Sequence, residues 1–521
     1  MKKFIFSIML CATLISNAQE KSLLTDQNFW KSNPTLTEVK AEVSKGFDFE
    51  NVEGSNDPVF QAINNNASLD VIKYLIDQPG VNLSRTIHEG RIYLHTSVSK
   101  GLPEITDYLI KKGSDINFID ANGHTAATFS GFNGTLKVDV LDVLIKNGLD
   151  PLKEYETKDN ADLLLLSIGY DKDFQITDYL LKNGASLSST DKNGNGIFFY
   201  ASRIGNVDIL KELVKRGVKY DDTALIAAAQ GTYRSANKAD TYQYLVDGLK
   251  LNPKATTPQG QTLLHLVTKK NQNQDEVIAY LLSKGVDASI VDKEGNTAFI
   301  NAAGGKSIEA VKVLFPFVKD INAKNNDDET ALLNAVKSST GEVVEFLIRN
   351  GADIYATDKD GNGAVYLLVD SYRAPRGRGG FGGAPQAGNT QGRAPQGQAN
   401  PAVQQQDDFA IKLNALQAKG LDFTKTFKDG KTVFHVAADK GDVNILKKLA
   451  GVKADINAQD KDGNTALHKA ALVAKNDEAL KYLVSLGADK SIRTEFGETA
   501  YDLAKENEIL AKNNVSIEFL K

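Results

Sequence analysis

The chain has 521 residues, with 61 Lys and Arg against 66 Asp and Glu, so its formal net charge is −5. This acidic balance favours solubility and argues against a surface devoted to nucleic acid or to anionic membranes. The single cysteine excludes an internal disulfide, and the length far exceeds what one hydrophobic core requires.

Residues 1–18 have the pattern of a signal peptide. Two lysines precede an apolar run over 4–15, and a small-x-small sequence closes the segment at 16–18. This pattern predicts cleavage before Gln19 and export from the cytoplasm. We expect the mature protein in the periplasm, with an extracellular location as the alternative.

A lipoprotein signal that uses Cys11 is a rival interpretation. It fits less well, because Leu10 stands where such signals resemble one another in having a small residue. The apolar run before Cys11 would also be very short.

Residues 19–54 are expected to form an N-terminal capping region. Thr35 is followed three positions later by Glu38, the pattern of a capping box, which predicts a helix through Val43. Trp30, the only tryptophan, is expected to cover the apolar face of the segment that follows.

From residue 55 onward a pattern of about 33 residues recurs thirteen times. Each copy opens with a box led by threonine or a substitute, and many close with a glycine-led turn such as Gly487-Ala488-Asp489. A fixed period of this length predicts small repeats that bury their apolar faces only by stacking. The copies begin at Asp57, Ile92, Thr125, Asp162, Gly196, Thr223, Thr262, Thr297, Thr330, Gly363, Thr432, Thr465 and Thr499.

Two helices are expected in each repeat. The first carries paired small residues, such as Ala302-Ala303, that allow close packing, and the second carries a bulky triplet such as Tyr482-Leu483-Val484. Six repeats share the tyrosine of that triplet. A stacking platform for bases or sugars is one interpretation, and packing between adjacent second helices is the one we favour.

The sequence from Asp460 to Ala471, followed by 480–484 and by the turn at Gly487, resembles an ankyrin repeat in the order of turn, box, helices and closing turn. One departure recurs, because alanine usually replaces the proline of the family's box. The resemblance implies an all-α solenoid of helix-turn-helix repeats with β-turn fingers. It also implies protein partners bound through the fingers and the groove-facing first helices.

The repeats are divided into a first array over 55–371 and a second array with a C-terminal cap over 408–521. Between them, residues 372–407 are dominated by Gly, Gln, Pro and Arg, a composition that predicts a disordered insertion between the two helices of one repeat. Its Arg-Gly stretch at 376–383 suggests an alternative function, the binding of glycan or nucleic acid.

Motifs for catalysis and for cofactors fail on inspection. Gly304-Gly305-Lys306-Ser307 lacks the first glycine of a phosphate-binding loop, and Asp358-Lys359-Asp360-Gly361 has its glycine too early for a calcium loop. Histidines at the box position are expected to bond the local backbone, so we predict no metal, no cofactor and no enzyme.

The predicted function is therefore that of an exported, monomeric scaffold for protein–protein interaction. The candidate contacts are finger positions of mixed charge, which give no clear sign for the partner. They are His88, Glu89, Asn122, Lys192, Asn193, Gln259, Lys293, Glu294, Lys359, Lys461 and Phe496.

Overall fold

The computed structural model describes residues 22–52, 54–153, 159–232, 235–269, 274–373 and 407–521. The predicted signal peptide and nearly all of the predicted insertion lie outside these residues. The chain divides into two compact units, Met1–Gly231 (unit 1) and Thr232–Lys521 (unit 2). The division falls inside the sixth repeat, between its two helices.

Each of the thirteen predicted repeats supplies two helices. The first helices are α3 (Pro58–Asn64), α5 (Tyr93–Lys100), α7 (Ala126–Phe132), α9 (Leu163–Ser167), α11 (Ile197–Ile204), α13 (Thr223–Gln230), α15 (Leu263–Thr268), α17 (Ala298–Gly304), α19 (Ala331–Ser338), α21 (Ala364–Asp370), α23 (Val433–Ala438), α25 (Ala466–Val473) and α27 (Ala500–Glu506).

The second helices are α4 (Leu69–Ile76), α6 (Pro103–Lys111), α8 (Val138–Lys146), α10 (Gln175–Lys182), α12 (Val207–Lys215), α14 (Ala239–Gln243), α16 (Asp275–Ser283), α18 (Ile308–Leu314), α20 (Gly341–Arg349), α22 (Asp408–Ala418), α24 (Val443–Lys448), α26 (Glu478–Ser485) and α28 (Glu508–Lys512). Short 3-10 helices cover Leu23–Thr25, Gly54–Asn56, His88–Gly90, Ile168–Tyr170, Phe315–Phe317, Lys428–Gly430 and Glu518–Leu520. A π-helical turn over Tyr244–Gly248 extends α14.

The first residue of each predicted copy lies at the start of a first helix. Twelve of the thirteen are N-cap residues, and Thr223 is instead the first residue of α13. Thr330, for example, accepts the backbone N–H of Leu333 on its hydroxyl at 3.3 Å. Such a bond satisfies one of the donors that the first turn of a helix leaves without a partner.

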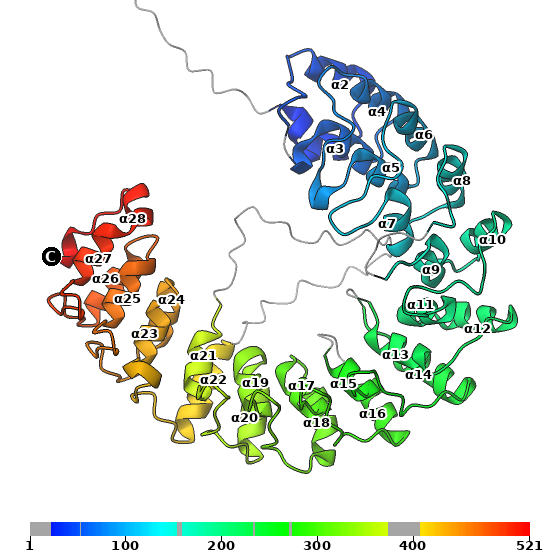
Figure 1. Cartoon of the computed structure of the whole chain (residues 1–521). Helices are drawn as coiled ribbons and strands as arrows, with labels where there is room; N and C mark the ends of the chain where they lie inside the picture. The colour runs from blue at the N-terminus through cyan, green and yellow to red at the C-terminus, as the bar shows by residue number, and fades with distance from the viewer. Residues whose placement is uncertain (1–21, 53, 154–158, 233–234, 270–273, 374–406) are drawn as a thin grey trace, which may run out of the picture. The chain divides into compact units, whose positions relative to one another are not determined.

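The two kinds of helix form two layers within each unit. In unit 2 the first helices α17, α19 and α21 pack side by side in one layer, and α18 and α20 lie side by side in the other (Figure 1). The paired alanines of the first helices are buried, as at Ala302 and Ala303. The leucine of each second-helix triplet is fully buried, as at Leu483. The core is therefore a continuous row of small interfaces between neighbouring repeats.

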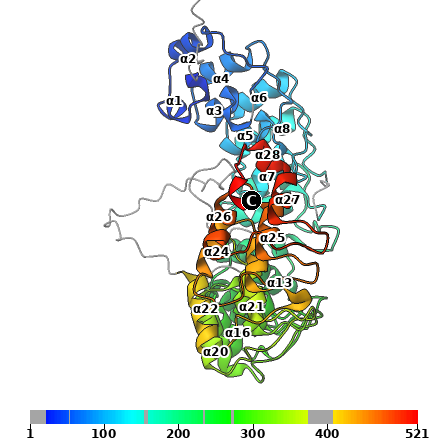
Figure 2. The ribbon, with the colours of Figure 1, turned by 90° about the vertical axis from the view of Figure 1, so that its left-hand side faces the viewer.

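The N-terminal cap packs on the first repeat. The predicted capping box is present, with Glu38 accepting the N–H of Thr35, and helix α2 covers Leu36–Val43. Trp30, in helix α1 (Gln27–Lys31), is buried and donates its indole N–H to the carbonyl of Leu24 at 2.8 Å. Helix α1 contacts α3, which the second view also shows (Figure 2).

The helices on either side of residues 374–406 belong to one repeat. Helix α21 precedes this segment in the layer of first helices, and α22 follows it and packs on α20. Asp408 accepts the backbone N–H of Gly341 at 2.8 Å, which fixes α22 in the layer of second helices.

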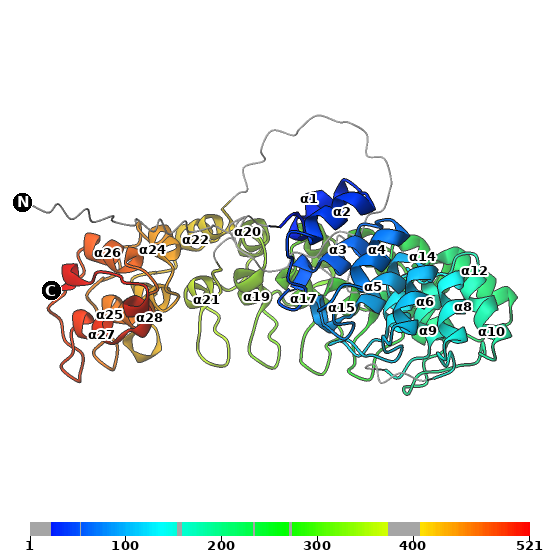
Figure 3. The ribbon, with the colours of Figure 1, turned by 90° about the horizontal axis from the view of Figure 1, so that it is seen from above.

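The all-α prediction is confirmed. Across the described residues the only β pairing consists of four isolated bridges, at the bases of turns such as Val291 with Thr297. These turns are the predicted fingers. Each lies between the second helix of one repeat and the first helix of the next, and several project on one side of the helices beside α17, α19 and α21 (Figure 3).

Candidate functional site: the finger ladder

Most of the described fingers are held by the side chain of the residue that opens the turn at the tip. The carboxylate of Asp292 accepts the backbone N–H groups of Glu294 at 3.2 Å and Asn296 at 2.8 Å. Gly295 follows with φ of 78°, a left-handed conformation that costs glycine little. Aspartate is favoured here because a short carboxylate side chain closes the turn on its own backbone. The tip residues between aspartate and glycine are thereby presented in a fixed geometry.

Neighbouring fingers are joined by backbone hydrogen bonds that we call the finger ladder. In each bond the donor is the N–H of the residue that follows the turn-forming residue, such as Lys293 after Asp292. The acceptor is the carbonyl of the second residue after the turn-forming residue of the preceding finger, such as Gln259 after Thr257. Among the described residues seven such bonds occur, from Ala121 to Glu89, Lys192 to Asp159, Lys293 to Gln259, Asn326 to Glu294, Lys359 to Asp327, Lys461 to Asp429 and Glu495 to Asp462, at 2.8–3.2 Å. Consecutive tips are therefore held in register.

All eleven predicted contact residues have exposed side chains at or beside the finger tips. His88, Glu89, Asn122, Lys192 and Asn193 belong to unit 1, and Gln259, Lys293, Glu294, Lys359, Lys461 and Phe496 belong to unit 2. Phe496 is the most exposed of the large apolar side chains described, at 84%. Their role in binding stays a prediction.

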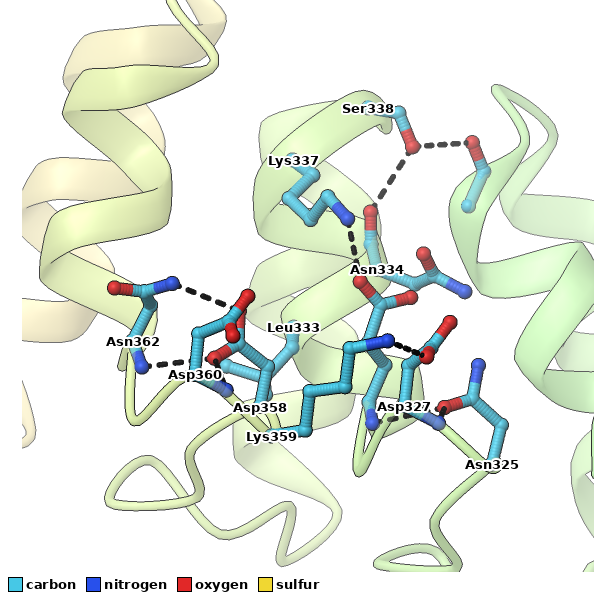
Figure 4. Close-up of polar contacts among 12 residues, drawn as sticks. Asn325, Asp327, Leu333, Asn334, Lys337, Ser338, Asp358, Lys359, Asp360 and Asn362 are labelled. Atoms are coloured by element: carbon cyan, nitrogen blue, oxygen red, sulfur yellow. Dashed lines mark hydrogen bonds and ion pairs between the residues drawn. The ribbon is translucent and has the colours of Figure 1, made fainter.

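Several of these side chains pair with the adjacent finger, which the spacing alone did not reveal. Lys359 forms an ion pair with Asp327 (Figure 4), and this hydrogen bond raises the pKa of the lysine. Lys461 lies 3.4 Å from the carboxylate of Asp429. Lys293 forms no ion pair with any described residue. The tips thus present lysines next to acids, and not a surface of one sign.

Polar residues of the first helices extend the surface beyond the fingers. On α19 the side-chain amide of Asn334 donates to the carbonyl of Ile300 at 3.4 Å, and the hydroxyl of Ser338 donates to that of Gly304 at 3.0 Å. Lys337 of α19 pairs with Glu329, which lies at the base of the finger that precedes this helix (Figure 4). Sequence reasoning did not select these residues. Their signal was polar residues spaced three and four apart on an otherwise apolar helix.

The box histidines connect each first helix to the next finger. His265 accepts the N–H of Thr262 on Nδ1 at 3.2 Å, and its Nε2 lies 2.9 Å from the carbonyl of Asn296. His435 and His468 make the same two contacts. Burial lowers the pKa of all three, so the neutral form with its proton on Nε2 suits the site. The prediction that these histidines bond the backbone is confirmed.

The shared tyrosines tie second helices together. Tyr280 donates its hydroxyl to Asp247 of the preceding repeat at 2.9 Å, and Tyr108 donates to Asp77 at 2.6 Å. Lys284 pairs with the same Asp247 at 2.5 Å. The packing interpretation therefore holds at these positions, because each hydroxyl is engaged with a neighbouring repeat.

No group of three or more His, Cys, Asp or Glu side chains among the described residues could hold a metal ion. The longest described helix, α22, has 11 residues, and none of the described helices combines the length and apolar character that a membrane span needs.

Comparison with known sequences identifies the repeats. The family model of ankyrin repeats in three copies matches residues 59–155, 164–255, 233–324, 264–358 and 402–494, which together exceed half of the chain. The probable 26S proteasome regulatory subunit p28 of Saccharomyces cerevisiae is 30% identical over 174 residues, which are 32% of this chain and 75% of that protein.

Two other relatives match this chain over only a small part of their own length. Protein phosphatase 1 regulatory subunit 12A of Mus musculus is 42% identical over 80 residues, 15% of this chain and 8% of its own length. Palmitoyltransferase AKR1 of Lachancea kluyveri is 29% identical over 196 residues, 36% of this chain and 25% of its own. Most of these two proteins thus lies outside the match. Taken with the stacked helix pairs and the finger ladder, the matches show that the chain belongs to the ankyrin-repeat family.

Proposed function

We propose that the protein is an exported scaffold that binds a folded protein partner through its finger tips and the adjoining first helices. The observation that carries this proposal is the finger ladder. A rigid ladder presents side chains whose positions are fixed before binding, which reduces the entropy lost on association. The names of two relatives as regulatory subunits fit a binding role.

The mixed charges of the tips favour a partner with alternating charges. In unit 2 the stretch from Lys293 to Lys359 places acids and lysines of successive fingers beside one another, as in the pair of Lys359 with Asp327. Charges at the rim of an interface act mainly on specificity and on the rate of association. We therefore expect capture that weakens with salt but does not vanish.

Export is the second part of the proposal and has its own test. N-terminal sequencing of the mature protein should give Gln19 as the first residue, which would agree with the signal pattern in 1–18. A lipid-modified Cys11 at the new terminus would place the protein on a membrane surface and would overturn a soluble periplasmic location.

The binding test reverses three tip lysines. A partner is first identified by pull-down from a periplasmic extract with mass spectrometry, and its affinity for the purified chain is measured. The triple variant Lys293→Glu, Lys359→Glu and Lys461→Glu should bind at least about tenfold more weakly, while its free energy of unfolding changes by less than about 1 kcal/mol because all three side chains are exposed.

A matched control keeps the same change in net charge. Lys284→Glu, Lys312→Glu and Lys481→Glu reverse three lysines on or directly after second helices of the same unit. This variant should retain affinity within about twofold. Equal weakening of both variants would mean that net charge, and not the finger surface, governs capture.

The insertion offers the competing explanation. If the partner binds the Arg-Gly segment, deletion of 373–406 should abolish capture and the tip variants should be neutral. If the fingers bind, the deletion should leave capture unchanged, because a shorter loop costs little in closure entropy.

A further inference from the structure

The sixth repeat has lost its finger. The step from Gly196 to Thr223 is 27 residues, six fewer than the usual 33. Helix α12 ends with the same glycine-led turn as its neighbours, at Gly217 with φ of 75°, but residues 218–222 then lead directly into α13. The preceding finger, residues 187–196, therefore has no successor within unit 1.

The exposed side of that finger is open at the position where the ladder would continue. The carbonyl of Asn193 occupies the accepting position of the ladder, yet none of the described residues donates to it. A Cβ added to Gly194 would meet no atom within 4 Å, whereas one added to Gly463 in a stacked finger would lie 2.7 Å from the nitrogen of Glu495. The carbonyl of Asn193 is thus left without a donor among the described residues, as is that of Asp360 in the finger that precedes residues 374–406.

The sequence of the next finger agrees with this gap. In the finger that begins at Thr257, the position that donates to the preceding finger is Pro258, which has no N–H. The seven donors of the ladder all lie at this position and none is proline. The finger that begins at Thr257 therefore cannot donate a ladder bond from this position.

The space left by the missing finger is a hollow of about 590 Å³. Its lining includes Ser189 and Thr190 of the finger and Phe198 and Phe199 of α11. The shortened loop closes it with Tyr220, which is 40% exposed and lies 5.1 Å from the ring of Phe198. The hollow combines aromatic side chains with hydroxyls, a composition that suits a peptide side chain together with its backbone.

The groups around the hollow carry charges of both signs. Lys219 of the short loop and Lys192 at the finger tip are exposed, and neither forms an ion pair with a described residue. The third cation, Arg216, is already held by Asp178 and Glu212. The acid on the rim, Asp221, is engaged by the N–H of Thr223 at 2.9 Å.

We propose that this hollow binds an acidic, extended segment of a partner protein in place of the missing finger. The segment places one aromatic side chain against the exposed face of Tyr220, and one backbone N–H donates to the carbonyl of Asn193 at the finger tip beside the hollow. Its acidic residues face Lys192 and Lys219. This inference rests on the proposed binding function and assigns to it a second, separate contact in unit 1.

The test restores the finger. Residues 219–222 are replaced by a copy of residues 287–296, which adds the six missing residues and returns the step to 33. A phage-displayed library of random dodecapeptides is selected on the natural chain and counter-selected on the restored variant. Circular dichroism and the unfolding midpoint establish that the variant is folded.

The expected result is a set of peptides that share one aromatic residue flanked by acids and that bind the natural chain alone. Lys219→Glu should weaken a selected peptide about tenfold, and Lys215→Glu, an equal change at a lysine outside the hollow, by less than about twofold. N-methylation of a single peptide amide should abolish binding, while methylation of the others should not.

Three results would overturn the proposal. They are a selection that yields no peptide specific to the natural chain, peptides without acids or aromatic residues, and equal effects of the two lysine variants. If the selection fails while the triple tip variant still loses its partner, only the hollow is refuted. If selected peptides block the partner while the triple tip variant binds normally, the finger surface of the proposed function is refuted instead.

Discussion

The fingers of unit 2 from Thr257 to Gly361 and the last finger of unit 1, residues 187–196, differ in one respect. The four fingers of the first set are linked by three consecutive backbone bonds and end at the carbonyl of Asp360, whereas the last finger of unit 1 has no finger after it in that unit, and no described residue donates to its Asn193 carbonyl. The helices beneath that finger still pack, because α11 contacts α13 and Leu225 is fully buried. Helix stacking and finger stacking are therefore separate features, and a loop shorter by six residues removes the second without the first.

The largest loss of stability is expected from substitutions that remove a buried leucine from the packed helices of either unit. Leu483→Ala in α26 and Leu180→Ala in α10 each remove a fully buried side chain and should each cost about 2–5 kcal/mol of unfolding free energy. Because each repeat contacts only its neighbours, hydrogen exchange should lose protection in the mutated repeat and those beside it. Uniform loss along the whole unit would contradict this nearest-neighbour picture.

A smaller loss of stability is expected at low pH, because it protonates the box histidines that connect first helices to the next finger. The pKa values of His265, His435 and His468 are lowered in the fold, mainly by burial. Below the unfolded value of about 6.5 the unfolded chain binds protons first, so stability is complete above this pH and falls as pH drops toward the folded values.

The measurement is the urea midpoint between pH 7.5 and 5.0. A variant with glutamine at all three histidine positions should show a flatter pH profile than the natural chain. If the natural chain instead gains stability as the pH falls over this range, the three histidines do not have lowered pKa values in the fold.

The finger ladder itself should contribute less. Lys293→Pro removes the N–H that donates to Gln259 and should cost about 0.5–1.5 kcal/mol. Pro258 occupies the same position in a finger that donates no ladder bond. Pro258→Lys should therefore change the free energy of unfolding by less than about 1 kcal/mol. Equal costs measured by urea unfolding would mean that the ladder bond is not what stabilises the finger.

The smallest effect is expected from the tip ion pairs. Lys359 and Asp327 are both more than half exposed, so Lys359→Met should alter the free energy of unfolding by less than about 0.5 kcal/mol. A double-mutant cycle with Asp327→Asn measures the coupling. A coupling well above this value would show that tip charges help to hold the fingers in register.

The sequence by itself determined the repeats, because their periodic signals are local. Threonine or aspartate at the start of the first helix, paired alanines within it and glycine after the second helix each act on neighbouring backbone. The capping box at Thr35 and the fingers at Asp292 and Asp460 follow from the same local chemistry. These features could be predicted one repeat at a time.

Only the tertiary structure decided how the fingers relate to one another. The bond from Lys293 to Gln259, the pairing of Lys359 with Asp327 and the contact of His265 with Asn296 all join residues of different repeats. The hollow beside Tyr220 was visible in the sequence only as a step of 27 residues. Whether this short step leaves a binding site depends on which groups have no neighbouring finger. The stacking of the repeats decides this, and no single segment does.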